Sequence, residues 1–180
     1  MISDDKIIEI FCSLDDFMKE FNSILDKNSI SDGSTTKKRN RKFKMSDSEV
    51  MTILVIFHLK SYRNLKHFYL NHVCKYRKDI FPNCVSYNRF VELQKKVTQP
   101  LAVFMKIFCL GDSTGISFID STPLKVCHYK REKQHQVYND KGEIIDFMFT
   151  PANVDDRFPL KQKKFHDKLF GKIFGDKGYS

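Results

Sequence analysis

The pattern of hydrophobic and polar positions over residues 4–27 is that of one long helix. Apolar side chains recur every three or four residues, which places them on a single helical face. The residues on this face are Ile7, Ile10, Phe11, Leu14, Phe17, Met18, Phe21, Ile24 and Leu25. We therefore expect an amphipathic helix that covers an apolar partner.

A polar, glycine-containing segment over residues 28–36 ends this pattern and leads into a run of basic residues. Side chains of like charge repel one another and stay solvated. The run consists of Lys37, Lys38, Arg39, Arg41, Lys42 and Lys44. The sequence thus predicts a basic linker over residues 28–45, with these six side chains as candidates for contact with DNA.

A second helix is predicted to begin after Ser46. Glu49 follows three residues later, so the two side chains can form a capping box, and Met45 and Val50 are placed for a hydrophobic staple. The apolar residues that follow predict a helix that ends at about Lys60.

The pattern predicts further helices up to residue 110. One is expected over residues 64–77, and another should begin at Ser86, after the break at Pro82. Pro100 should kink or divide that helix before residues 101–110 continue it. The region 1–110 is therefore expected to be all-helical.

Two architectures fit these consecutive short helices. In a helix-turn-helix, the helix that begins after Ser86 would be the recognition helix, with Arg89 near its N-terminus as a DNA contact. A plain helical bundle uses the same hydrophobic pattern. The sequence leaves both open.

From residue 116 onward the pattern changes to that of a mixed α/β domain. A short apolar run predicts a strand over 116–120, and residues 135–149 predict a hairpin with its turn at 139–142. An amphipathic helix is expected over 158–169, ended by Gly171, followed by a strand over 172–174. The predicted fold class is α+β, with domains at residues 1–110 and 116–180.

Two aspartates, Asp120 and Asp176, end two of these apolar strands. A carboxylate at the end of a buried strand is costly unless it is paired or bound to a metal. Each acid alone could cap the neighbouring turn. The order strand, hairpin, helix, strand is that of a partial RNase H-like domain, in which a right-handed crossover lays the last strand parallel to the first. The two carboxylates would then face each other and could bind Mg²⁺ or Mn²⁺.

Composition narrows the class of protein. The chain has 31 Lys and Arg against 22 Asp and Glu, a net charge of +9, which favours a polyanionic partner such as nucleic acid. Five widely spaced cysteines argue against a disulfide framework. The first ten residues are acidic and lack a basic segment followed by an apolar one, which argues against a secretory signal. No apolar run approaches the roughly twenty residues of a membrane span. We therefore expect a cytoplasmic protein without a membrane partner.

Several sequence blocks resemble the transposases of insertion-sequence family nine-eighty-two. The blocks are FIDSTPLKVC, NDKGEI, FMFTPANVDDRFPL and GKIFGDKGY, and the similarity extends back through SYRNLKHFYL, FPNCVSYNRFVELQK and FCLGDSTGISFIDS, to about residue 40. The resemblance implies a bacterial, nucleoid-associated enzyme of the DDE class. Such an enzyme would cut DNA at the ends of the mobile element and join these ends to target DNA, using Mg²⁺ or Mn²⁺. It makes Asp120 and Asp176 the first and second catalytic acids.

The chain also departs from that family. HYKREKQHQ runs almost directly into VYNDKGEI, which indicates an internal deletion, and residues 1–180 contain no counterpart of the family's catalytic glutamate. Glu143, Asp155 and Asp156 are not expected to replace it, because metal ligands require accurate placement. We therefore expect a truncated, inactive transposase. The alternatives are a residual DNA-binding protein, which could associate with itself or with full-length relatives, and a non-functional fragment.

Overall fold

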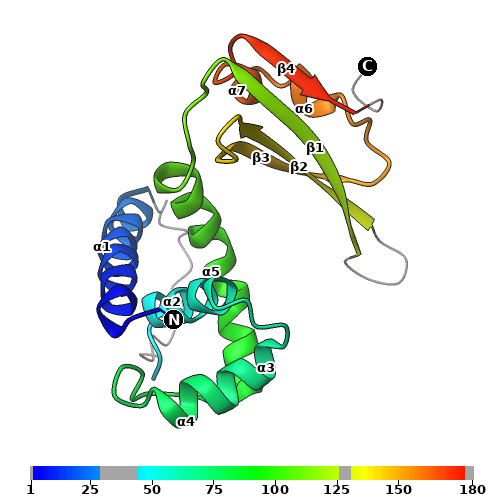
Figure 1. The fold of residues 1–180 in the computed structure, drawn as a ribbon. Coiled ribbons are helices and arrows are strands. Elements are labelled where there is room, and N and C mark those ends of the chain that lie inside the picture. Colours follow the sequence, from blue (N-terminus) through cyan, green and yellow to red (C-terminus); the bar gives the residue numbers. More distant parts are fainter. Residues whose placement is uncertain (1, 29–43, 126–130, 177–180) are drawn as a thin grey trace, which may run out of the picture. The chain divides into compact units, whose positions relative to one another are not determined.

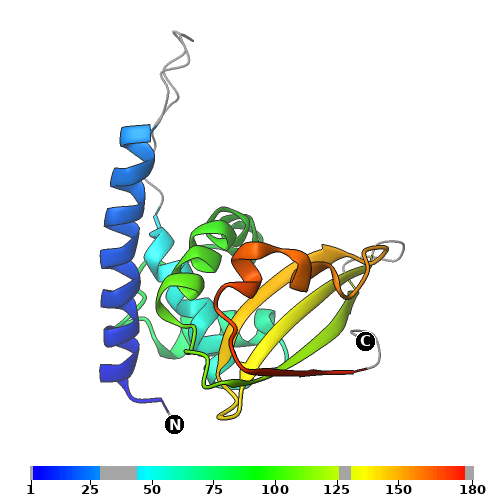
Figure 2. The same cartoon turned by 90° about the horizontal axis from the view of Figure 1, so that it is seen from above.

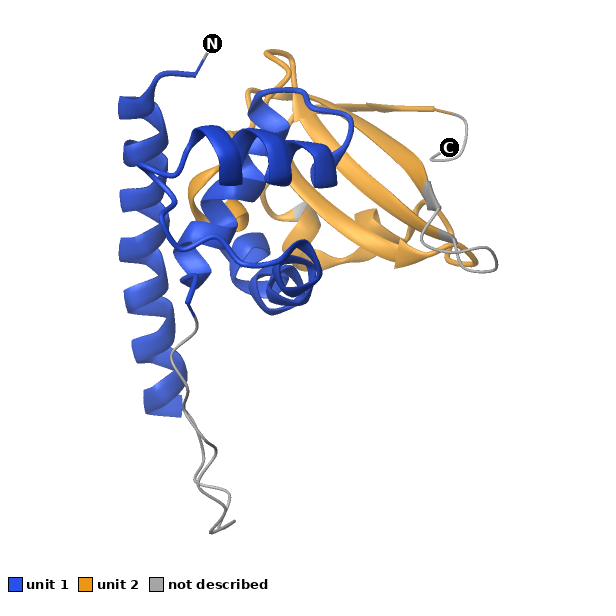
Figure 3. Ribbon diagram, turned by 90° about the horizontal axis from the view of Figure 1, so that it is seen from below, with its two compact units in different colours: residues 1–104 blue, residues 105–180 orange. Residues whose placement is uncertain are grey.

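The computed structural model describes residues 2–28, 44–125 and 131–176, and the chain divides into two compact units, residues 1–104 and 105–180 (Figures 1 and 3). The first unit is helical and the second contains a four-stranded sheet. The predicted α+β class, with a helical region followed by a mixed sheet, is confirmed. Of the predicted basic linker, residues 29–43 lie outside the described residues, and Lys44 is described and exposed.

Helix α1 (Asp4–Asn28) confirms the first predicted helix. Two acids in its first turn, Asp4 and Asp5, interact favourably with the positive end of the helix dipole. Its buried face carries Ile7, Leu14, Phe17 and Met18, which belong to the predicted apolar stripe. The helix is thus amphipathic in the expected way.

Helix α2 (Asp47–Leu59) begins where the sequence predicted. The Ser46 side chain accepts a hydrogen bond from the backbone N–H of Glu49, and the Glu49 side chain accepts one from the backbone of Ser46, so the capping box is present. Met45 and Val50 are both buried. Because α2 is apolar on most sides, it lies in the interior of the first unit.

The helix predicted over 64–77 is present, but it contains a π-helical segment. It consists of α3 (Leu65–His67), the π-helix η1 (Phe68–Val73) and α4 (Cys74–Tyr76). Asn64 caps its start by accepting a hydrogen bond from the backbone N–H of His67. The wider π-helical turn was not predicted, and such turns are frequent at functional sites.

Helix α5 (Tyr87–Phe108) begins after Ser86, whose hydroxyl accepts a hydrogen bond from the backbone N–H of Arg89. Pro100 was expected to kink or divide this helix, and it does not divide it: α5 is continuous from Tyr87 to Phe108. Pro100 cannot donate a backbone hydrogen bond, but its ring is buried like Val97, so packing offsets the lost bond.

The second unit contains one mixed sheet in the order β3-β2-β1-β4 (Figure 2). Strands β1 (Ile116–Lys125), β2 (Arg131–Asn139) and β3 (Ile144–Pro151) form an antiparallel meander, and β4 (Lys172–Gly175) lies parallel to β1. The predicted hairpin and the predicted parallel pairing of the last strand with the first are confirmed.

Strand β1 is longer than predicted, so Asp120 does not end it. The strand continues to Lys125 because β2 provides a ladder partner for every residue, from Asp120 opposite Gln136 to Lys125 opposite Arg131. The polar residues after Asp120 hid this continuation, since a strand that is exposed on one face needs no apolar run.

The predicted single helix over 158–169 is wrong. It is divided into α6 (Phe158–Lys161) and α7 (Lys163–His166), with Gln162 in an extended conformation between them. In an unbroken helix, Leu160 and Phe165 would point about 140° apart. The break allows both side chains to pack against the core residues of the sheet, which are Ile119, Val137 and Ile145.

Gly171 positions β4 beside β1. Its φ of +81° is a left-handed conformation that favours glycine, and a Cβ atom at this position would lie 2.1 Å from the carbonyl oxygen of Gly115. The next residue, Lys172, donates its backbone N–H to that same oxygen at 2.8 Å. The close approach at Gly171 therefore sets the start of the parallel pairing.

Candidate functional site

Asp120 and Asp176 follow the last residues that pair between β1 and β4. The parallel register runs from Ile116 opposite Lys172 to Ile119 opposite Gly175, and Asp176 lies just beyond the end of β4. The two sequence-predicted acids thus stand at the same end of this pairing, each directly after the last paired residue of its segment.

The surroundings of these acids differ from the prediction. We expected carboxylates at the ends of buried strands, but Asp120, Asp176 and the whole of β4 are exposed. The cost of burying a charge therefore does not decide where these acids lie. Both acids therefore lie at the solvent-exposed surface of the second unit.

Tyr138 on β2 is a neighbour that sequence reasoning missed. It is opposite Phe118 in the β1–β2 ladder, and Phe118 stands two residues before Asp120. The Tyr138 ring therefore lies diagonally beside Asp120 on the same face of the sheet. Burial raises the pKa of Tyr138, and the negative charge of Asp120 raises it further. The hydroxyl therefore stays protonated at neutral pH and can donate a hydrogen bond.

Two phenylalanines lie beside the acids. Phe118 and Phe174 stand two residues before Asp120 and Asp176, and their rings stack with centroids 5.6 Å apart. They are 46% and 51% exposed. The acid pair thus lies at the end of an exposed aromatic strip, whereas the sequence pattern had predicted a buried strand.

The three acids not expected to complete the site have other partners. Asp155 accepts hydrogen bonds from the backbone and side chain of Arg157, which lowers its pKa to about 2. Asp156 forms an ion pair with Lys133 at 3.0 Å, and Glu143 accepts a hydrogen bond from the Asn139 side chain at 2.7 Å. Among residues 2–28, 44–125 and 131–176, no three His, Cys, Asp or Glu side chains form a group that could hold a metal ion.

The candidate DNA contacts are only partly described. Lys37, Lys38, Arg39, Arg41 and Lys42 lie outside the described residues. Arg89, in the first turn of α5, forms an ion pair with Glu92 one turn later. A phosphate would therefore have to compete with Glu92 for this guanidinium.

No helix in the described part of the chain has both the length and the apolar character needed to cross a lipid bilayer.

The comparisons with known proteins bear on the second unit. No curated protein matches the chain significantly. A family model described as a transposase DDE domain matches residues 110–141 and, in a second segment, residues 132–180. These segments contain β1 to β4 and both candidate acids. The match supports a DDE-class transposase.

Proposed function

We propose that this chain derives from a DNA transposase of insertion-sequence family nine-eighty-two, with a partial RNase H-like catalytic domain. Its reaction is the metal-dependent cleavage of DNA at the ends of the element and the transfer of those ends to target DNA. The observation that carries the proposal is the parallel pairing of β1 with β4, which ends at Ile119 opposite Gly175, the residues directly before Asp120 and Asp176. The matched family model and the resembling sequence blocks support it.

The donor chemistry of the acid pair fits Mg²⁺ or Mn²⁺. Mg²⁺ prefers oxygen ligands and is commonly held by one or two carboxylates together with water and substrate phosphates. Asp120 and Asp176 are the residues that would hold it. A metal bound there would stabilise negative charge at a phosphodiester and lower the pKa of bound water. The protein would hold the two carboxylates in fixed register at the sheet.

Residues 1–180 by themselves are proposed to lack strand cleavage. They contain two of the three catalytic acids that the resemblance implies, and Glu143, Asp155 and Asp156 have other partners. An internal deletion before β2 is part of the same proposal. Its support is that HYKREKQHQ runs almost directly into VYNDKGEI, where the resembling family has a longer stretch.

Metal binding at the acid pair can be tested without catalysis. Mn²⁺ is titrated into the full chain, and the paramagnetic broadening of backbone amide signals is recorded by NMR. Broadening centred on the ends of β1 and β4, lost in Asp120→Asn and kept in Asp167→Asn, is expected. Asp167 is an exposed acid at the end of α7. Broadening that is equal in both variants would contradict the proposed site.

Cleavage is tested on supercoiled plasmid with Mg²⁺ or Mn²⁺. No nicking is expected, because two carboxylates without the third leave the metals under-coordinated. Metal-dependent nicking that disappears in Asp120→Asn would show that residues 1–180 are active, and would overturn the proposed inactivity.

The alternative function is that of a residual DNA-binding protein, which associates with itself or with full-length relatives. The net charge of +9 and the basic run 37–44 favour it. Each phosphate contact releases counterions, so affinity should fall steeply with salt. The test compares the salt dependence of duplex binding for the wild type and for a variant with all six basic residues changed to Gln. An unchanged slope would exclude this segment from the interface.

A further inference from the structure

The first unit contains a basic cavity that neither the sequence patterns nor the matched family model assign. Its volume is about 600 Å³, and it lies where the end of α2, the turn after it, η1 and the end of α4 meet. Six of the residues that line it are Leu59, Lys60, Ser61, Tyr62, His72 and Arg77. Three of these six side chains are basic.

The basic groups are close enough to influence one another. The Lys60 ammonium lies 2.7 Å from Nε2 of His72, so it can donate a hydrogen bond to the neutral imidazole. Burial lowers the pKa of both groups. The positive charge of Arg77 lowers both pKa values further, and that of Lys60 adds to the effect on His72. The cavity therefore concentrates positive charge in a partly desolvated place.

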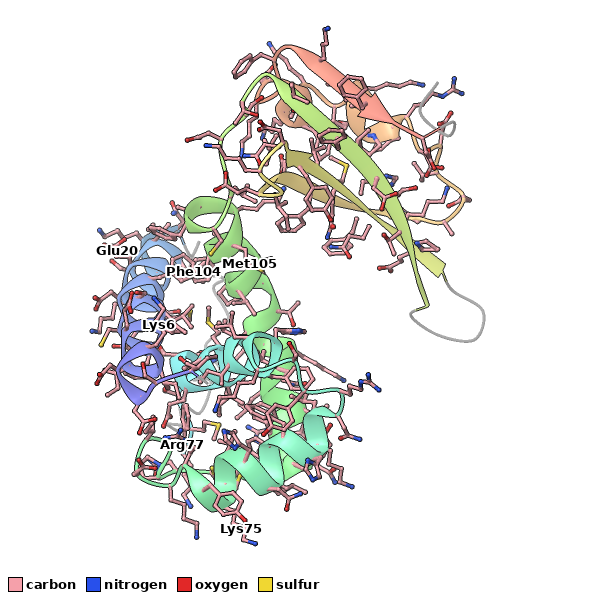
Figure 4. All side chains as sticks on the ribbon, in the orientation of Figure 1. Lys6, Glu20, Lys75, Arg77, Phe104 and Met105 are labelled. Atoms are coloured by element: carbon pink, nitrogen blue, oxygen red, sulfur yellow. The ribbon has the colours of Figure 1, made fainter. Side chains whose placement is uncertain are left out.

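One carboxylate partly balances this charge. Arg77 forms an ion pair with Asp4 in the first turn of α1, and Figure 4 shows Arg77 beside the start of that helix. Asp4 is also the acid that opposes the lowering of the Lys60 pKa. Two cations and a titratable imidazole thus face one carboxylate, which leaves a net positive site.

The side chains around the imidazole hold it in place. The His72 ring stacks on Phe68 with centroids 5.4 Å apart, and the Tyr62 ring lies tilted beside it with centroids 5.7 Å apart. Ser61, in the turn between α2 and Tyr62, has a φ of +52°, a left-handed conformation that is uncommon for a residue other than glycine. Backbone strain of this kind tends to occur at ligand sites. The basic groups are therefore built into the fold, unlike scattered surface lysines.

We propose that this cavity binds a phosphate group. The Lys60 ammonium supplies a point charge, and the Arg77 guanidinium, which a phosphate would share with Asp4, can hold two phosphate oxygens at once. An anion would also relieve the repulsion between Lys60 and Arg77. The volume exceeds that of one phosphate, so the adjoining part of a nucleotide also fits. The phosphate belongs either to the DNA backbone, which rests on the proposed function, or to a free phosphate compound.

Direct binding is tested on the unaltered full chain. Inorganic phosphate is titrated at constant ionic strength, with chloride as the replacement ion, and the ring signals of His72 are followed by NMR. A saturable shift is expected. Lys60→Gln should weaken the binding at least tenfold. The matched control is Lys75→Gln, which removes the same charge from an exposed position on α4 (Figure 4). A shift that does not saturate in the wild type, or equal weakening in both variants, would overturn the proposal.

A second arm identifies the source of the phosphate. The salt dependence of binding to a 20-base-pair duplex is measured for the same three proteins. Loss of one phosphate contact lowers the slope by about one. A lower slope in Lys60→Gln alone assigns the cavity to the DNA backbone, whereas equal slopes with phosphate binding intact assign it to a free phosphate. If the wild type binds no DNA, the proposed function is contradicted. The phosphate titration then still tests whether the cavity binds a phosphate group.

Discussion

The two units bury their apolar residues in different ways. In the first, helices enclose a continuous core, in which Tyr69 and Phe90 stack with ring centroids 4.1 Å apart. In the second, a small core lies on one face of the sheet, and Phe118 and Phe174 remain about half exposed on the other face. Exposed apolar faces of this kind are typical of surfaces that bind another protein or a ligand.

The chemistry of the units differs as well. The first unit carries the basic cavity, and the second carries Asp120 and Asp176 at one end of the β1–β4 pairing. We propose that the helical unit binds phosphate and that the sheet unit binds metal.

The core of the second unit consists of few residues, so substitutions in this core should lower the free energy of unfolding most.

The largest effect is expected for Phe165→Ala. This side chain is 1% exposed and packs in the core of the second unit, so its loss leaves a cavity and should cost about 3–5 kcal/mol of unfolding free energy. The control is Phe118→Ala on the exposed face, which should cost below about 1 kcal/mol. Chemical denaturation followed by NMR signals of the sheet measures both. Similar costs would show that the exposed face is covered in solution.

A smaller effect, centred on the acid pair, is expected for Gly171→Ala. The left-handed backbone and the contact with Gly115 both oppose a Cβ atom, so the substitution should cost about 1–3 kcal/mol and release β4 from β1. Hydrogen exchange of the β4 amides measures the release, with Gly142→Ala in the open hairpin turn as the control. Unchanged protection in Gly171→Ala would mean that the parallel pairing does not depend on this close approach.

The second unit should lose stability below neutral pH because of His135. Burial lowers the pKa of this histidine in the folded state, and its Nε2 lies 2.8 Å from the hydroxyl of Thr150. The unfolded chain therefore binds a proton more readily. The stabilisation that neutral His135 provides is complete above about pH 6.5, the pKa of histidine in the unfolded chain. It is lost as the pH falls below that value, and the free energy of unfolding then decreases by at most about 1.4 kcal/mol per pH unit.

This pH dependence is measured as the unfolding free energy of the sheet between pH 7.5 and pH 5. His135→Gln should be less stable than the wild type at pH 7.5 and should show a flatter profile. If the variant keeps the full slope, another group causes the pH dependence. The lowered pKa of His72 predicts the same sign of effect in the first unit.

The smallest effect is expected for Ser46→Ala in the first unit. The substitution removes the oxygen that accepts from the backbone N–H of Glu49 and should cost about 1 kcal/mol. Ser13→Ala, at an exposed position within α1, is the control and should be nearly neutral. The loss should appear in the melting of helical signals. A loss above about 3 kcal/mol would show that the cap supports more than the end of α2.

Much of the fold followed from patterns within short stretches. The stripe of α1 and the capping box at Ser46 depend on residues only a few positions apart, so the sequence predicted both. The parallel pairing of β1 and β4 followed from the order of elements and from the handedness of crossover connections. The position of Asp120 and Asp176 at the same end of that pairing was a consequence of this order.

The sequence did not predict where β1 ends, the break at Gln162 or the π-helical turn in η1. Each depends on partners that lie elsewhere in the chain. The ladder from β2 extends β1 beyond Asp120, and the core of the sheet draws both Leu160 and Phe165 inward. Local propensity contains no information about such partners.

By itself, the sequence determined the helical and mixed regions, the basic charge and the two acids that the family pattern marks. Only the tertiary structure decided that those acids are exposed, and that Lys60, His72 and Arg77 line one cavity. Periodicity records which positions are apolar, and this is a property of neighbours along the chain. Exposure and the meeting of like charges depend on how distant segments pack, which no short stretch of sequence specifies.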